Sequence, residues 1–117
     1  MAVIDYVQTE VRSFQDYAIK VTWETLTETN STGAPFLIAA FNTIAIQFAG
    51  TFGGGSVVLE GSIDGATYFT LDDVEGAAIS KSAAGMETSG DYALWVRPRV
   101  ASGTGVDVDA IMICRRA

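Results

Sequence analysis

The chain has no histidine and one cysteine among its 117 residues. Without histidine there is no Ser-His-Asp or Cys-His nucleophilic machinery, and no zinc or non-haem iron site that uses histidine ligands. The lone cysteine, Cys114, cannot form an internal disulfide or a thiolate cluster. It lies on an apolar face of the last predicted strand, so we interpret it as a buried small hydrophobe and not as a reactive thiol.

Positive charge is also scarce. Lys and Arg number 7 against 14 Asp and Glu, which gives a formal net charge of −7. Nucleic acids and anionic membranes attract clustered basic residues, so this balance argues against both as partners. No apolar run reaches the roughly 18 residues of a membrane span. Acidic residues, Asp5 and Glu10, stand where a signal peptide has basic ones, so we expect synthesis in a cytoplasm.

Apolar residues are abundant by comparison, at 49% of the chain against 18% charged residues. A chain of this length has one hydrophobic core, because a second would leave each core too small to be stable. This single core cannot bury all of the apolar side chains, so part of the apolar area is expected at the surface. We expect one domain that makes contact with a partner or with copies of itself.

Period-two alternation of apolar residues predicts an all-β fold. In Thr43 to Phe52, one face carries the large apolar side chains and the other carries Thr43, Gln47 and Thr51. The last segment, Val106 to Arg116, alternates in the same way, and no segment has clear helical periodicity. Together with the turn signals, these patterns predict an antiparallel β-sandwich or jelly roll of about seven to eight strands in a single domain.

Turn residues divide the chain into further strands. Tyr17 to Thr27 and Tyr92 to Val100 read as strands, and Phe36 to Phe41 as a short buried one. The glycines 53–55 predict a hairpin, and the Asp64-Gly65 turn predicts a second, so the two would form a meander. Residues 76–90 read as a loop with at most a short strand near 78–80. Pro98 lacks a backbone donor, which places it at an edge or an irregular point of its strand.

The first 14 residues alternate loosely and contain no Gly or Pro. They form either an arm that lies on a neighbouring subunit or an edge strand of the same domain, which then comprises residues 15–117. The contacts of such an arm would come from its apolar side chains, which are Val3, Ile4, Tyr6, Val7 and Phe14.

Four other groups of residues are candidates for chemistry or binding. Asp72, Asp73 and Glu75 resemble cation ligands, but their spacing does not match an EF-hand, so we favour a solvated acidic turn. Arg97 and Arg99 point to the same side of their strand and either bind carboxylates on a neighbouring molecule or form a solvated face. No pair of carboxylates can be assigned as a catalytic acid and nucleophile. The remaining group is aromatic, and it forms either a sugar-stacking platform or, as we favour, core and strand packing: Trp23, Trp95, Tyr68, Tyr92 and Phe69.

From Phe48 to Arg116 the chain resembles small structural proteins of tailed bacteriophages. The resemblance rests on FAGTFGGGSVVLEGSIDGATYFTL, on the Ala-Ala-Gly stretch of residues 83–87, on WVRPRV and on the final strand ending in CRR. It implies a virion component, and most of all a capsid decoration (cement) protein, made in the host cytoplasm and bound to the outside of the shell. The implied partners are the major capsid protein and copies of the chain, with a trimer favoured. No enzymatic activity, cofactor or metal is expected.

Two other functions are compatible with the same residues. A carbohydrate-binding module on the virion would stack its exposed aromatic side chains on host glycans. A head-to-tail or tail component would assemble into rings through a long loop, for which residues 76–90 are the candidate.

Overall fold

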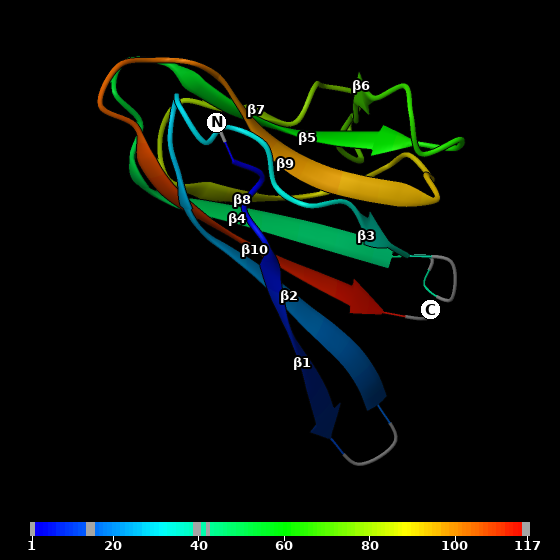
Figure 1. Cartoon of the computed structure of the whole chain (residues 1–117). Helices are drawn as coiled ribbons and strands as arrows, with labels where there is room; N and C mark the ends of the chain where they lie inside the picture. The colour runs from blue at the N-terminus through cyan, green and yellow to red at the C-terminus, as the bar shows by residue number, and fades with distance from the viewer. Residues whose placement is uncertain (1, 14–15, 39–40, 42, 116–117) are drawn as a thin grey trace.

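The chain folds into a sandwich of two antiparallel five-stranded sheets, as seen in a computed structural model that describes residues 2–13, 16–38, 41 and 43–115. Sheet one contains, in spatial order, β1 (Tyr6–Ser13), β2 (Asp16–Leu26), β10 (Asp107–Arg115), β4 (Thr43–Thr51) and β8 (Gly85–Thr88). Sheet two contains β3 (Phe36–Leu37), β9 (Trp95–Ser102), β5 (Ser56–Ser62) and β6 (Phe69–Thr70), with β7 (Ser80–Lys81) also paired to β5. Figure 1 shows the two layers stacked face to face.

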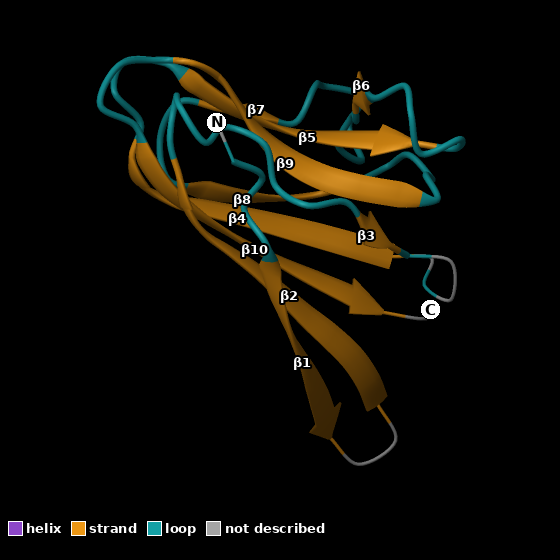
Figure 2. Cartoon of the chain, in the orientation of Figure 1, coloured by secondary structure: helices purple, strands orange, loops and turns teal. Residues whose placement is uncertain are grey.

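The predicted all-β sandwich is confirmed. The described residues form strands and loops with no helix (Figure 2), so none of them supplies a helix able to cross a bilayer. Seven strands have four residues or more, and the other three, β3, β6 and β7, have two residues each. These short strands bring the total in the described residues to ten. Period-two patterns cannot reveal a strand of two residues, which explains the lower number expected from the sequence.

The core lies between the sheets and follows the predicted alternation. Along β4 the side chains of Ile44, Ile46 and Phe48 are buried, and along β10 every second residue from Val108 to Cys114 is buried. On the opposite, outer face of β10, Ile111 and Ile113 are half-buried. The outer face of this strand is therefore only partly covered.

The three glycines do not form the expected hairpin. β4 belongs to sheet one and β5 to sheet two, so residues 53–55 cross from one sheet to the other. Their turn packs against the β9–β10 turn, which also changes sheet. A Cβ on Gly55 would lie 1.9 Å from the carbonyl oxygen of Ser102, and one on Gly53 would lie 2.2 Å from that of Thr104. Gly53 and Gly55 therefore allow the close approach of two crossing turns, which no local pattern encodes.

Two further expectations need correction, and one holds. Among the described residues of 36–41, the strand β3 comprises Phe36 and Leu37 alone, and Phe41 N donates to Ile38 O at 2.8 Å. Residues 76–90 contain β7 and also β8, which extends sheet one by pairing with β4. The Asp64-Gly65 turn does form a hairpin, because β5 pairs with β6.

Pro98 lies where the pairing of β9 changes partner. On one side it pairs with Leu59 of β5. On the other side β3 pairs with Trp95 and Val96 only, and past Val96 Gly33 N donates to Pro98 O at 2.9 Å. This is an irregular point of the strand, as the missing backbone donor requires.

Trp23 of β2 joins the two sheets at the same place. Its side chain is fully buried, and its Nε1 donates to Ala34 O at 3.0 Å. Gly33 packs between this indole and Pro98 so closely that a Cβ would lie 2.7 Å from Trp23 Cδ1 and 2.7 Å from Pro98 Cδ. The connection between the sheets therefore passes over the indole with no space for a side chain.

We predict that Gly33→Ala destabilises the protein by about 1–3 kcal/mol, because the added methyl group overpacks a closed contact. Urea denaturation measures the change. The control is Gly85→Ala, where the new Cβ would meet only Lys81 at 3.5 Å, an ordinary contact distance. Equal effects of the two substitutions would argue against the packing account.

Candidate interaction surfaces

The β1–β2 hairpin extends past the rest of the sandwich (Figure 1), which gives the molecule a length of 43 Å against widths of 26 and 25 Å. β1 pairs with β2 over its whole length, from Tyr6 opposite Trp23 to Ser13 opposite Asp16. Pairing of β2 with β10 ends at Ala18. Residues 1–14 thus include the edge strand β1, and the far end of the β1–β2 hairpin lies beyond Arg115, the last described residue of β10.

The five apolar residues that we expected in an N-terminal contact are divided by the fold. Val3 and Val7 are exposed. Ile4 and Tyr6 are half-buried and pack against the core, and Tyr6 meets Trp23 and Phe36 edge-to-face. Phe14 lies outside the described residues. Only part of this segment is therefore available to a partner.

A groove of about 730 Å³ lies between the hairpin and the edge of sheet two. It exists because β1 reaches further than the short strand β3 opposite it. Tyr17 and Phe41 stack here with ring centroids 6.4 Å apart, and the Arg12 guanidinium lies 5.0 Å from the centroid of Tyr17. The lining side chains are Tyr6, Gln8, Arg12, Tyr17, Ile19, Phe36, Leu37 and Phe41.

One row of residues on the outer face of sheet one crosses all five strands and contains three apolar and two polar side chains. The register places Val7, Thr22, Ile111, Gln47 and Met86 side by side. Val7 and Met86, at the two ends, are exposed, and Ile111 in the middle is half-buried. A solvated outer face of an antiparallel sheet is usually polar, so this row is a candidate contact surface.

Arg97 and Arg99 both pair with a carboxylate of the same chain. Both donate through Nε to one carboxylate, that of Glu60, at 2.9 and 2.8 Å. The side chain of Glu60 is 6% exposed, and those of Arg97 and Arg99 are 25% and 36% exposed. Glu60 lies opposite Arg97 in the β5–β9 register, a pairing that is not readable from either strand alone.

Tyr68 completes this cluster. The Arg97 guanidinium lies 3.7 Å from the centroid of its ring. Burial raises the pKa of the Tyr68 phenol, and its hydroxyl has no hydrogen-bond partner within the described part of the chain. The cluster as a whole carries one net positive charge and is held together within a single molecule.

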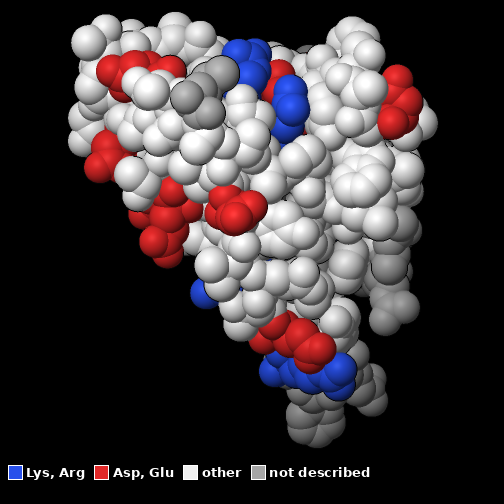
Figure 3. Space-filling view, in the orientation of Figure 1, with Lys and Arg blue, Asp and Glu red and all other residues white. Residues whose placement is uncertain are grey.

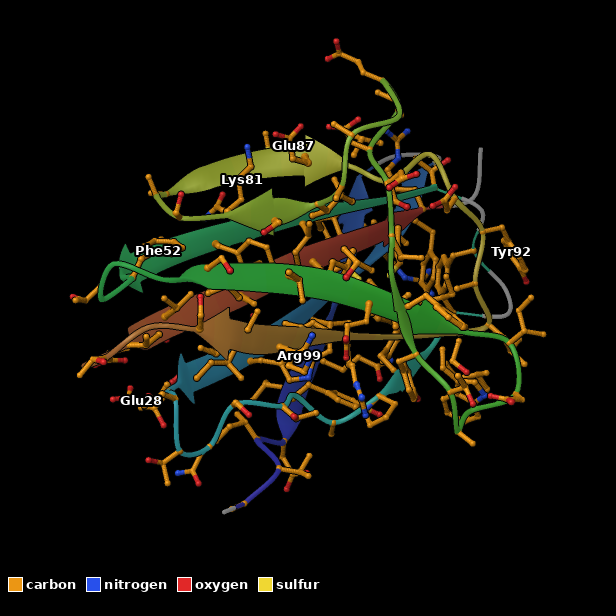
Figure 4. All side chains as sticks on the ribbon, turned by 90° about the horizontal axis from the view of Figure 1, so that it is seen from above. Glu28, Phe52, Lys81, Glu87, Tyr92 and Arg99 are labelled. Atoms are coloured by element: carbon orange, nitrogen blue, oxygen red, sulfur yellow. The ribbon has the colours of Figure 1, made fainter. Side chains whose placement is uncertain are left out.

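A second groove, of about 390 Å³, lies at the end of the sandwich where β5 finishes, and we call it the end groove. Figure 4 shows Tyr92 at this end, pointing away from the body of the protein. The large apolar side chains of Ile63, Phe69 and Tyr92 line it and are all exposed. The other lining residues are Gly61, Ser62, Asp64, Thr67, Thr70, Leu71, Asp91 and Ala93.

Asp64 holds the turn that forms one wall of the end groove. Its Oδ1 accepts hydrogen bonds from Thr67 N at 2.9 Å, Ala66 N at 2.8 Å and Ser62 Oγ at 2.8 Å. These donors favour the charged form and lower the pKa of Asp64 to about 2. The turn therefore keeps a negative charge at the rim of the groove throughout the physiological range.

The acidic residues after β6 form a hydrogen-bonded turn. Asp73 Oδ1 accepts from Glu75 N at 2.8 Å and from Ala77 N at 3.0 Å, and Asp72 N donates to Asp91 Oδ2 at 2.8 Å. Within the residues described, no cluster of three or more His, Cys, Asp or Glu side chains has metal-binding geometry. The carboxylate of Asp73 is thus used in shaping the backbone.

Cys114 is buried in the core, and burial raises the pKa of its thiol to about 12. This agrees with its interpretation as a small hydrophobe. The five aromatic residues considered as a sugar-stacking platform do not share one surface. Trp23 is buried, Tyr68 and Trp95 are half-buried, and only Phe69 and Tyr92 are exposed on the end groove.

We predict that Glu60→Gln destabilises the protein by about 2–3 kcal/mol, because it leaves two partly buried guanidinium groups without a counter-charge. The matched control is Glu10→Gln, which removes the partner of Arg12 in an exposed ion pair and is expected to cost no more than about 0.5 kcal/mol. Urea unfolding of both variants measures the difference. A Glu60→Gln effect as small as that of the control would contradict the structural role of this cluster.

We predict that Asp64→Ala lowers the melting temperature at neutral pH but not near pH 2. The pKa of Asp64 falls from its ordinary value of 3.8 to about 2 on folding, so its contribution to stability is present above pH 4 and is lost as the pH falls towards 2. Thermal melts of both proteins between pH 2 and pH 7 measure the gap. A gap that stays constant down to pH 2 would show that the carboxylate charge is not involved.

Comparison with known proteins gives a likeness in fold. No family model and no curated protein matches the chain. Among solved structures, the chain is similar to the one described as "Crystal structure of SPBc2 prophage-derived protein YomS", with a TM-score of 0.59 and 18% sequence identity. The alignment covers 89% of this chain and 96% of that one. The likeness therefore spans almost the whole sandwich, and at this level of identity it concerns the fold alone.

Proposed function

We propose that this protein is a structural component of a tailed-phage virion that decorates and stabilises the outside of the capsid. In this proposal it binds the major capsid protein and copies of itself, as a homotrimer, and catalyses no reaction. The observation that carries the proposal is the exposed apolar surface of the sandwich, on the hairpin, on the outer face of sheet one and at the end groove. Exposed apolar patches of this kind mark contact sites.

Two further observations support a phage origin. The stretch from Phe48 to Arg116 resembles small virion proteins in its order of turns and strands. The structurally similar protein YomS is described as prophage-derived. The proposed capsid role is supported by the resemblance together with the exposed surfaces described above.

Decoration of a shell suits a small protein with several modest contact surfaces. Burial of apolar area supplies roughly 25 cal/mol per Å², from which the costs of association are subtracted. Each contact is weak, but a protein that holds the shell and its neighbours at once gains avidity. The net charge of −7 keeps the unassembled protein soluble.

The direct test is addition of the purified protein to expanded, emptied capsids of the encoding phage that lack it. We expect the protein to sediment with the shells and to raise their melting temperature in calorimetry. Absence of co-sedimentation would falsify the proposal. Sedimentation velocity of the free protein tests the homotrimer separately.

The contact between copies can be tested on the hairpin. Deletion of residues 1–14 is unsuitable, because Ile4 and Tyr6 pack against the core. We predict that Val7→Lys with Val11→Lys reduces self-association and shell occupancy several-fold, because two charges then occupy an exposed apolar strip. The control is Val74→Lys, at an exposed valine on the distant acidic turn. Unchanged occupancy with the double variant would remove the hairpin from the contact.

A further inference from the structure

The end groove combines large exposed apolar side chains with a charge of one sign. Ile63 is 77% exposed, Phe69 70% and Tyr92 60%, and all three line the same groove. Among the described lining residues, the charged ones are Asp64 and Asp91, both acidic. In Figure 3 the right-hand part of the surface, over the end of the sandwich, carries few charged groups.

The groove is already shaped in the free protein. At its floor, a Cβ on Gly61 would lie 2.6 Å from Ala93 Cβ and 2.8 Å from Leu71 Cδ2, so the backbone of β5 is closely packed there. One wall is held by the hydrogen bonds of the Asp64 turn, and the other by Asp91, whose Oδ2 accepts from Asp72 N. Leu94 N also donates to Ser62 O at 3.0 Å, which joins the two walls. A rigid groove of this kind loses little freedom when it is occupied.

The end groove differs from the other exposed surfaces in its charge. The hairpin groove contains Arg12, which pairs with the neighbouring Glu10, so its rim carries both signs. In the Arg97–Glu60–Arg99 cluster, both guanidinium groups already pair with a carboxylate of the same chain. At the end groove the two carboxylates have no basic residue among the described lining side chains to neutralise them. A complementary partner therefore brings both an apolar group and a positive charge.

We propose that the end groove docks an extended segment of the capsid shell protein that carries a Lys or Arg next to a large apolar side chain. The apolar side chain lies between Phe69 and Tyr92, and the basic group faces Asp64 and Asp91. This inference rests on the proposed decoration function and names the surface of the protein that meets the shell. Aromatic side chains at the centre of a contact contribute most of its binding energy, and charges at its rim select the partner.

The test uses the full chain and emptied shells of the encoding phage. We expect Phe69→Ser with Tyr92→Ser to weaken shell binding roughly ten- to a hundredfold, with an unchanged melting temperature of the free protein. The control is Val74→Ser, at a side chain of similar exposure (67%) on the acidic turn and outside the three proposed contact surfaces, which should bind as the wild type does. If the wild type fails to bind shells, the decoration function is wrong. If the wild type and the double variant bind equally, only the docking surface is wrong.

A second pair of substitutions tests the charge. Asp64→Asn with Asp91→Asn keeps hydrogen-bond acceptors in the turns and removes both carboxylate charges. We expect this variant to bind several-fold more weakly than the wild type in about 50 mM salt and to approach the wild type in about 500 mM salt, because salt screens charge attraction. An equal salt dependence of both proteins would overturn the basic partner.

The competing occupant is a sugar, since exposed aromatic rings next to carboxylates also suit carbohydrate hydroxyl groups. A glycan array of the wild type and of the Phe69→Ser, Tyr92→Ser variant separates the two. No glycan signal supports the protein segment. A glycan that binds the wild type, is lost in the variant and displaces the protein from shells would overturn it.

Discussion

Burial of the Trp23 indole is the constraint on which the arrangement of the sheets depends. A buried indole needs an acceptor for its N–H, and here the acceptor is Ala34 O, on the chain segment that leads from sheet one into sheet two. That segment must therefore pass directly over the ring. Gly33 makes this approach possible, and its N–H then pairs with Pro98 O, at the point where β9 has lost β3 as a neighbour. The Trp23 side chain thus determines where the chain crosses between the sheets, where the pairing of β9 becomes irregular and where β3 begins.

At the edge formed by β1 and β3, the strands of sheet one are longer than those of sheet two, and this difference in length leaves part of sheet one uncovered. Strands β1 and β2 have 8 and 11 residues, whereas β3, at the facing edge of sheet two, has two. The hairpin consequently extends beyond its cover and leaves the groove lined by Tyr17 and Phe41. At the other edge, the ion pair between Lys81 on β7 and Glu87 on β8 connects sheet two with sheet one (Figure 4). The two sheets are therefore linked at the β7–β8 edge, whereas a groove separates them at the β1–β2 hairpin.

The charge balance acquires a different meaning once the pairs are known. Four of the basic residues, Arg12, Lys81, Arg97 and Arg99, form ion pairs with carboxylates of the same chain. The end groove shows the complementary situation, because its carboxylates stand beside exposed apolar rings. The excess of acidic residues is therefore relevant to binding at a particular place, besides its effect on solubility.

Local alternation determined the class of fold in this protein. In β4 and β10 the apolar residues recur at every second position, and a strand with one buried face needs that period, so these strands and their inward residues were predictable. The Asp64-Gly65 turn was predictable for a similar reason, since the turn chemistry is contained in four consecutive residues. A lone cysteine on the apolar face of β10 was likewise recognisable as part of the core.

Tertiary structure alone decided which strands pair and which surfaces remain open. The glycines 53–55 have the composition of a hairpin, yet Gly53 and Gly55 pack against the turn between β9 and β10, and such a contact leaves no local trace. The pairing of Glu60 with two arginines depends on the register between β5 and β9. Phe69 and Tyr92 line one groove because the segment after β6 and the segment before β9 meet in space, where Asp72 N donates to Asp91 Oδ2. Strand periodicity is a property of neighbours in the chain, whereas a site is a property of neighbours in space.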